Sequence, residues 1–168
     1  MEFSAGLSQG EGVERRHLIE SHDYHVEVIS SAEKTGTLTA IADALPELAV
    51  ASPPEFGGPA HIWSPEHLFV ASVAGCLMTT FRSMAARSGV EVIDYTDEAI
   101  GFLRRDEDGL YSIEKVILRP KIVISADSKR DRAERLIERA EKVCLISRSI
   151  SSKVVLESSV VEFHQVGT

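Results

Sequence analysis

An apolar helix is the feature that most constrains how this chain folds. Residues 64–81 read SPEHLFVASVAGCLMTTF, and on a helix their apolar side chains would lie on nearly every side. Ser64 suits the N-cap and Pro65 the first helical position, while Gly89 suits a helix end. Because a helix that is apolar on most sides belongs in a core, the segment predicts a buried central helix from Ser64 to about Ser88.

The rest of the chain divides into strand-like segments and one further helix. Residues 127–144 carry an apolar stripe at helical spacing beside a charged face. The proline- and glycine-rich stretch 51–63 predicts a loop. Strand-like patterns occur on both sides of the central helix, at residues 16–29, 37–45, 91–105, 109–125 and 153–163. This order predicts an α+β fold with a largely antiparallel sheet, in a single domain over residues 15–168 that follows a loose arm at 1–14.

Charge and composition exclude several classes of function. The 168 residues fit one domain, and the net charge of −8 argues against nucleic-acid binding, which needs a concentrated basic surface. The first residues, MEFSAGLSQGEG, lack the apolar core of a signal peptide, and polar residues interrupt the apolar run of the central helix. We therefore expect a cytoplasmic protein without a membrane span, whose two cysteines stay reduced unless they cycle.

Two thiols stand out in this pattern. Cys76 lies within the apolar helix, and Cys144 ends the apolar stripe of the second helix. Core packing explains either one, because free cysteine is among the most buried residue types. His61 and His67 flank the start of the central helix, so a metal site with Cys76 is one alternative. No cluster of His and Cys has zinc-ligand spacing, however, and we expect no metal.

Three motifs taken together resemble the OsmC/Ohr family, the osmotically induced and organic-hydroperoxide-resistance proteins. They are PPEFGG, then WSPEHLFVASVAGC, and finally AEKVCLISRSI. The resemblance extends from about residue 24 to the last strand. It implies an OsmC-like fold, in which an antiparallel sheet wraps around a long buried central helix. It also implies an intertwined homodimer.

The same resemblance implies a thiol peroxidase that reduces organic hydroperoxides to alcohols. Cys76 would be the peroxidatic residue, which attacks the peroxide as a thiolate and becomes a sulfenic acid. Cys144 would resolve that sulfenic acid by forming a disulfide. An external dithiol, such as a lipoyl protein, would then reduce the disulfide, and no cofactor is implied.

A thiol inside a core needs a charge nearby to stay ionised. Its ordinary pKa is about 8.5, burial raises that value, and the helix dipole fades well before Cys76, which lies about three turns into its helix. In the family an arginine on a turn between early strands supplies the charge, and the matching stretch AEKTG has Lys34 there. Lysine brings the charge without the planar fork of arginine. Another cation could take this place, and the candidates are Arg15, Arg16 and Arg82. Their spacing from Cys76 in the sequence supports none of them.

Glu66 stands at the start of the helix, where the helix dipole favours a carboxylate and capping explains it. A functional interpretation needs a second chain. Ten residues of helix span about 15 Å, so Glu66 cannot touch Cys76 of its own chain. It can reach Cys76 of a partner chain if two such helices pack antiparallel about a twofold axis. We therefore expect a homodimer with two composite sites.

Four aromatic residues are candidates for an apolar substrate pocket near the thiol, which would suit bulky organic hydroperoxides. Core packing is their alternative explanation. They are Phe56, Trp63, Phe69 and Phe81.

Two other functions stay open at this point. One is a non-catalytic member of the same fold that binds an apolar ligand or senses oxidation through Cys76, and the replacement of arginine by Lys34 favours it. The other is a metal-binding or purely structural stress protein, which draws only on the two histidines and Cys76.

Overall fold

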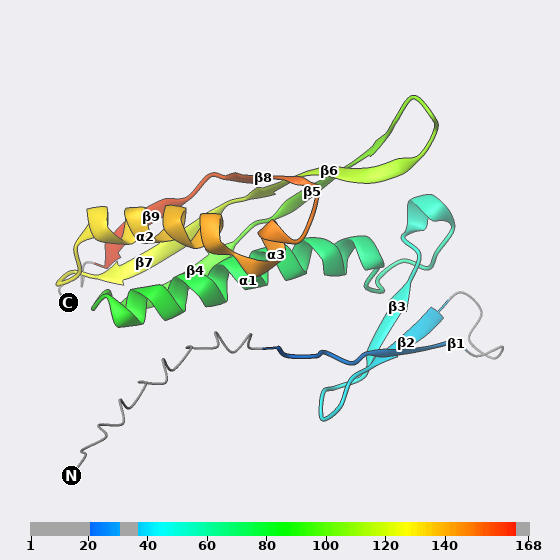
Figure 1. Ribbon diagram of the computed structural model, residues 1–168, viewed down its shortest axis with the longest axis horizontal. Helices are drawn as coiled ribbons and strands as arrows, with labels where there is room; N and C mark the ends of the chain where they lie inside the picture. The colour runs from blue at the N-terminus through cyan, green and yellow to red at the C-terminus, as the bar shows by residue number, and fades with distance from the viewer. Residues whose placement is uncertain (1–20, 31–36, 164–168) are drawn as a thin grey trace, which may run out of the picture.

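Three long strands and two helices form the main body of the chain. The computed structural model describes residues 21–30 and 37–163 (Figure 1). Each long strand bends near its middle and so consists of two segments. In chain order the segments are β4 (Val92–Asp97), β5 (Ile100–Arg105), β6 (Tyr111–Leu118), β7 (Pro120–Ser125), β8 (Lys153–Leu156) and β9 (Ser159–Phe163).

The middle strand, β6 followed by β7, pairs with both of the others. It runs antiparallel to β5 and β4 and parallel to β8 and β9. The turn between β5 and β6 is closed by Gly109 at φ 85° and by Asp106 Oδ1, which accepts a hydrogen bond from Leu110 N–H at 2.7 Å. The antiparallel hairpin is therefore as predicted. The last strand joins in parallel because the chain returns to the sheet through a helix.

A second, smaller sheet lies on the other side of the central helix in Figure 1. It is antiparallel and consists of β1 (Glu27–Ser30), β2 (Thr37–Ile41) and β3 (Leu48–Ala51). Ala51 N–H donates to the Trp63 carbonyl at 2.9 Å and so joins this sheet to the segment that leads into the central helix. All four residues of β1 are exposed, which leaves one edge of the sheet uncovered.

The central helix, α1 (Pro65–Arg87), begins and ends as its sequence predicts. Ser64 caps it, because the Ser64 side-chain oxygen accepts a hydrogen bond from His67 N–H at 3.3 Å. At the other end Gly89 has φ 66°, and Val90 N–H bonds at 3.0 Å to the carbonyl five residues earlier. This is a Schellman ending, which requires a residue in the left-handed region.

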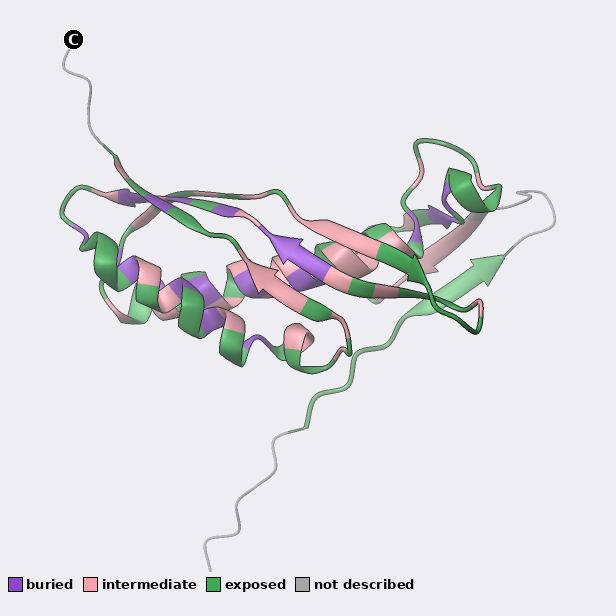
Figure 2. Cartoon of the chain, turned by 90° about the horizontal axis from the view of Figure 1, so that it is seen from above, coloured by how far each residue is buried: buried purple, intermediate pink, exposed green. Residues whose placement is uncertain are grey.

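One side of α1 forms the core together with α2 (Arg130–Val143) and the main sheet. The buried side repeats every four residues along α1, and Figure 2 shows the buried residues concentrated between the layers. The buried core residues of the cluster are Val73, Leu77, Phe81, Ala85, Val90, Val116, Leu118, Ile122, Ile124, Ala133, Ile137, Ala140 and Val160. Ala71, Ser72 and Thr79 on α1 are exposed, so a single chain does not cover the helix on most sides.

Among the described residues, α1 is the one helix whose length and composition would allow it to cross a bilayer. The core helix of a soluble protein passes the same test, so the finding is weak evidence for a span. In this structure the apolar side of α1 packs against α2 and the main sheet.

Three short elements differ from the sequence predictions. β3 and the 3₁₀ turn η1 (Pro54–Phe56) lie in or beside the expected loop, and α3 (Leu145–Arg148) follows α2 directly. Such short elements depend on tertiary contacts, whereas periodicity needs longer windows to be recognised. The strand expected at residues 16–29 is shorter within the described residues, because β1 begins at Glu27.

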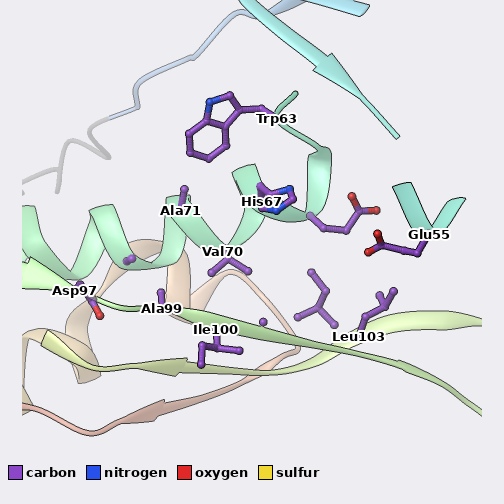
Figure 3. Close-up of a pocket in the computed structure, with 13 residues that line it drawn as sticks. Glu55, Trp63, His67, Val70, Ala71, Asp97, Ala99, Ile100 and Leu103 are labelled. Atoms are coloured by element: carbon purple, nitrogen blue, oxygen red, sulfur yellow. The ribbon is translucent and has the colours of Figure 1, made fainter. Parts of the chain in front are cut away.

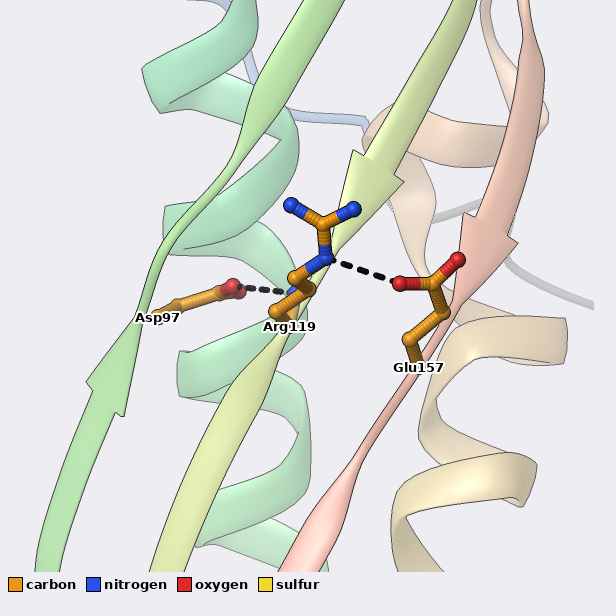
Figure 4. A network of polar contacts seen from close by, with 3 residues as sticks. All are labelled: Asp97, Arg119 and Glu157. Carbon is orange, nitrogen blue, oxygen red and sulfur yellow. Dashed lines mark hydrogen bonds and ion pairs between the residues drawn. The ribbon is translucent and has the colours of Figure 1, made fainter.

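A polar contact joins the three long strands where they bend. Arg119, between β6 and β7, donates its backbone N–H to Asp97 Oδ1 at 2.8 Å, and its side-chain Nε lies 2.8 Å from Glu157 Oε2 (Figure 4). One residue of the middle strand thus contacts both neighbouring strands. Burial raises the pKa of Asp97, although the Arg119 N–H and the Tyr95 hydroxyl act to lower it. Burial and the nearby Asp97 likewise raise the pKa of Tyr95.

We expect the substitution Asp97→Asn to remove a pH-dependent part of the stability. Because the folded-state pKa is raised, this group's contribution to stability is fully present below the ordinary carboxyl pKa of about 4 and is lost as the pH rises through the folded-state value. The thermal midpoint of Asp97→Asn should therefore rise relative to that of the wild type as the pH increases above about 4. Thermal unfolding followed by circular dichroism measures this difference, and a difference that does not change with pH would contradict the prediction.

Candidate functional site

The two cysteines meet where α1 passes the joint between α2 and α3. Cys76 is half-buried on α1, and Cys144, the residue between α2 and α3, is fully buried. Both are free thiols, and their side chains are hydrogen-bonded to each other. The fold therefore brings together the two thiols that the sequence analysis singled out.

Hydrogen-bond donors surround the sulfur of Cys76. Burial acts to raise its pKa, but the Cys144 thiol, the Ile146 N–H, the Thr80 hydroxyl and the Leu145 N–H lower it, and the resulting pKa lies below the ordinary thiol value. The Ile146 nitrogen lies 3.5 Å from the sulfur. These donors favour the thiolate, because hydrogen bonds to the charged form of a group stabilise that form.

The pKa of Cys144 shifts in the opposite direction. Burial raises it, and the hydrogen bond to Cys76 raises it further, in spite of the hydroxyl and N–H of Ser147. Of the two thiols, Cys76 is therefore the one that ionises more readily, and Cys144 is the hydrogen-bond donor of the pair. The pair is polarised before any substrate arrives.

Within the described residues, the contacts that lower the pKa of Cys76 are all hydrogen bonds. Lys34, the expected cation, lies outside the described residues, and so do Arg15 and Arg16. Arg82 lies on α1 and is exposed. Amide, hydroxyl and thiol donors thus supply part of what the sequence analysis assigned to a cation.

Glu66 lies in the first turn of α1 and is not beside Cys76 of its own chain. The two residues are ten positions apart on one helix, which corresponds to about 15 Å. The Oε2 atom of Glu66 is buried and has no hydrogen-bond partner among the described residues. This carboxylate is therefore free to accept a group from outside the described part of the chain.

A cavity of about 570 Å³ lies between α1 and β5. Figure 3 shows Val70 on the side of the helix that faces Ile100 and the strand, whereas Ala71 lies on the side nearer Trp63. A Cβ atom at Gly101 would lie 2.5 Å from Val70 Cγ2, so glycine is needed for β5 to approach α1 this closely. Carboxylates from three segments, those of Glu55, Glu66 and Asp97, also line this cavity.

A second cavity, of about 510 Å³, lies near the start of α1. It is lined by Glu66, Phe69, Tyr111 and the residues that follow α3. Neither cavity is lined by Cys76 or Cys144. The chemistry of this site therefore rests on the contact between the thiols.

The four aromatic residues do not gather into one pocket. Trp63 lines the larger cavity and Phe69 the smaller one. Phe56 is 46% exposed beside the start of β6. Phe81 is fully buried and belongs to the core cluster, so core packing explains it.

The groups that surround the two sulfurs were not among the site residues predicted from the sequence. Thr80 lies one helical turn after Cys76, and this spacing of four is a signal that could have identified it. Leu145 and Ile146 act through their backbone N–H groups, and Ser147 through its hydroxyl and N–H. These three residues form the first part of α3, which the sequence analysis did not predict.

The metal alternative gains no support from residues 21–30 and 37–163. In these ranges no group of three or more His, Cys, Asp or Glu side chains is arranged to hold a metal ion. The His67 Nδ1 atom lies 2.8 Å from Ser64 Oγ at the cap of α1, and His61 lies in the preceding loop at φ 64°.

We expect Thr80→Val to raise the pKa of Cys76, because it removes a donor from the thiolate while keeping the shape of the side chain. Losing one hydrogen bond to a charged group should move the pKa upward by about one unit. The rate of Cys76 alkylation by iodoacetamide as a function of pH measures this shift. Thr79→Val is the matched control, since the Thr79 hydroxyl bonds only to the carbonyls of Gly75 and Cys76. Equal shifts in both variants would contradict the role of Thr80.

Comparison with known proteins places the chain in a family. A Bacillus subtilis protein named YmaD is 31% identical over 112 residues, which cover 65% of this chain and 74% of that protein. A solved OsmC-like protein of unknown function from Vibrio cholerae is 27% identical, with a TM-score of 0.74 over 84% of this chain and 100% of that chain. An organic hydroperoxide resistance protein from Elizabethkingia anophelis shares the fold at 19% identity, with a TM-score of 0.68 over 87% of this chain and 100% of its own. The sequence model of the family described as OsmC-like protein matches residues 58–159. The chain therefore belongs to the OsmC-like protein family.

Proposed function

We propose that this protein reduces organic hydroperoxides to alcohols through its two thiols. The observation that carries the proposal is the contact between Cys76 and Cys144, whose pKa values shift in opposite directions. The lowered pKa makes Cys76 the nucleophile, and the buried thiol beside it is in position to become its disulfide partner. The fold shared with an organic hydroperoxide resistance protein supports the choice of substrate class.

The proposed reaction has three steps. First, the Cys76 thiolate attacks the peroxide, the O–O bond breaks, one oxygen stays on sulfur as a sulfenic acid, and the alkoxide takes up a proton to leave as the alcohol. Second, the Cys144 thiolate attacks the sulfenic sulfur, the S–O bond breaks, and hydroxide leaves and is protonated to water. Third, an external dithiol gives two electrons and two protons to the disulfide and becomes a disulfide itself.

We further propose that the working form is a homodimer in which Glu66 completes the site of the partner chain. Three observations on the described residues support this: α1 has an exposed side, Val28 and Ile29 of β1 are exposed, and Glu66 Oε2 is buried without a partner. Two α1 helices packed antiparallel about a twofold axis would cover the exposed sides and bring each Glu66 toward Cys76 of the partner subunit. Lys34 is the proposed cation between the carboxylate and the thiolate.

A second candidate function is the sensing of oxidation without turnover. The two larger cavities favour a role without turnover at the thiols, because neither cavity is lined by a cysteine. A sensor would form the same disulfide once and then transmit the change.

Peroxide turnover separates these two functions. Reduced wild-type protein, mixed with cumene hydroperoxide and dihydrolipoamide, should consume peroxide over many turnovers, whereas Cys76→Ser should stay at the background rate because it lacks the nucleophile. One equivalent of peroxide without the dithiol should give an intrachain disulfide between residues 76 and 144, detectable by mass spectrometry. Equal peroxide loss in wild type and Cys76→Ser would exclude the enzyme. A disulfide formed once, without continued turnover, would favour the sensor.

The composite site predicts complementation between two inactive variants. Glu66→Gln and Cys76→Ser chains, produced together, form mixed dimers in which one of the two sites has both groups intact. With random pairing we expect about a quarter of the wild-type activity, although each variant alone has little. Differently tagged chains and sedimentation would verify the mixed dimer. A verified mixed dimer without activity would contradict the composite site, and an unchanged rate in Lys34→Met would exclude Lys34 from it.

A further inference from the structure

Ser147 carries a buried hydroxyl to which the rest of the fold gives no partner. Its Oγ is shielded from solvent and has no hydrogen-bond partner of ordinary geometry among the described residues. It lies on α3, three residues after Cys144, and its hydroxyl and its backbone N–H both act to lower the pKa of Cys144. A buried polar group without a partner is rare in folded proteins, so its presence beside a reactive thiol calls for an explanation.

In the second step of the proposed reaction, Cys144 must lose its proton before it can attack the sulfenic acid. In the resting pair the Cys144 thiol is a hydrogen-bond donor that lowers the pKa of Cys76. Once Cys76 has become a neutral sulfenic acid, that acceptor is lost, while Cys144 remains fully buried. Ionisation of Cys144 then depends on the donors that remain next to its own sulfur.

We propose that Ser147 prepares Cys144 for this step by donating a hydrogen bond from its hydroxyl to the sulfur as the thiol proton leaves. The inference rests on the proposed peroxidase function and extends it to the resolving half of the cycle. The Cys144 thiolate forms the S–S bond as the S–O bond of the sulfenic acid breaks, and the proton that Cys144 loses ends on the departing hydroxide, which becomes water. Ser147 keeps its own proton throughout, so its part is to stabilise the thiolate.

A neighbouring serine offers a matched control. The Ser149 hydroxyl donates to the Leu145 carbonyl at 2.8 Å, and Ser149 is exposed. Both serines therefore belong to the same short segment, but of the two only Ser147 lowers the pKa of Cys144.

Single-turnover kinetics of the full chain test the inference. Reduced protein is mixed with one equivalent of cumene hydroperoxide, quenched with acid, and analysed by mass spectrometry for thiol, sulfenic acid and disulfide over a range of pH. In Ser147→Ala we expect the peroxide to disappear at a rate within about twofold of the wild type, while disulfide formation becomes about tenfold slower at neutral pH and its pH midpoint moves upward. Ser147→Thr should restore both, and Ser149→Ala should behave as the wild type. When the peroxide is instead supplied in excess, slow resolution should also leave more Cys76 over-oxidised to sulfinic acid, because a second peroxide then reaches the sulfenic acid.

A second readout separates this inference from the peroxidase proposal. Ultraviolet titration of the Cys144 thiolate in a Cys76→Ser background needs no peroxide, and adding Ser147→Ala should raise the pKa of Cys144. A raised pKa without any peroxide reaction in the wild type would contradict the peroxidase and leave the effect of Ser147 on the thiol in place. An unchanged pKa, or an unchanged rate and pH profile of disulfide formation, would overturn the inference. Ser147→Gly, which also removes the hydroxyl, replaces the alanine variant if that chain does not fold.

Discussion

The packing of α1 against α2 and the main sheet is the constraint on which the rest of the structure depends. Its buried side repeats every four residues, so the helix lies along the core and passes the joint between α2 and α3. Cys76 meets Cys144 at this crossing. Each residue of a helix advances the side chains by about 100°, so a shift of α1 by one residue would turn the Cys76 sulfur away from its donors.

Hydrogen bonds and burial together shift the pKa values of the two thiols in opposite directions. The donors around Cys76 come from three segments, α1, α3 and the joint before α3, and they outweigh the cost of partial burial. Cys144 is more deeply buried, and burial together with its hydrogen bond to Cys76 raises its pKa. A thiol pair of this kind is poised with one nucleophile and one proton donor, which is the arrangement that a two-thiol redox cycle requires.

Residues at the bend between β4 and β5 line the larger cavity beside α1. Asp97 ends β4, takes part in the contact with Arg119, and also lines the larger cavity. Gly101 then allows β5 to lie close to α1 at the floor of that cavity. None of the carboxylates of this region, Glu66 with its unpartnered oxygen included, is among the groups that shift the pKa of either thiol. This separation agrees with the proposal that a second chain completes the site.

The sequence by itself determined the limits of α1, the presence of α2, the antiparallel hairpin, the two thiols and the family resemblance, although α2 begins at Arg130, three residues after its predicted start. These features depend on local sequence patterns, such as Ser64 at the N-cap, Gly89 at the left-handed position and the apolar periodicity of each helix. Only the tertiary structure decided the parallel pairing of the last strand, the place of Phe81 in the core, and the donors at the two sulfurs. The physical reason is that a backbone N–H, such as that of Ile146, is the same for every residue except proline. Where it points depends on how distant segments pack, and no local pattern in the sequence records that.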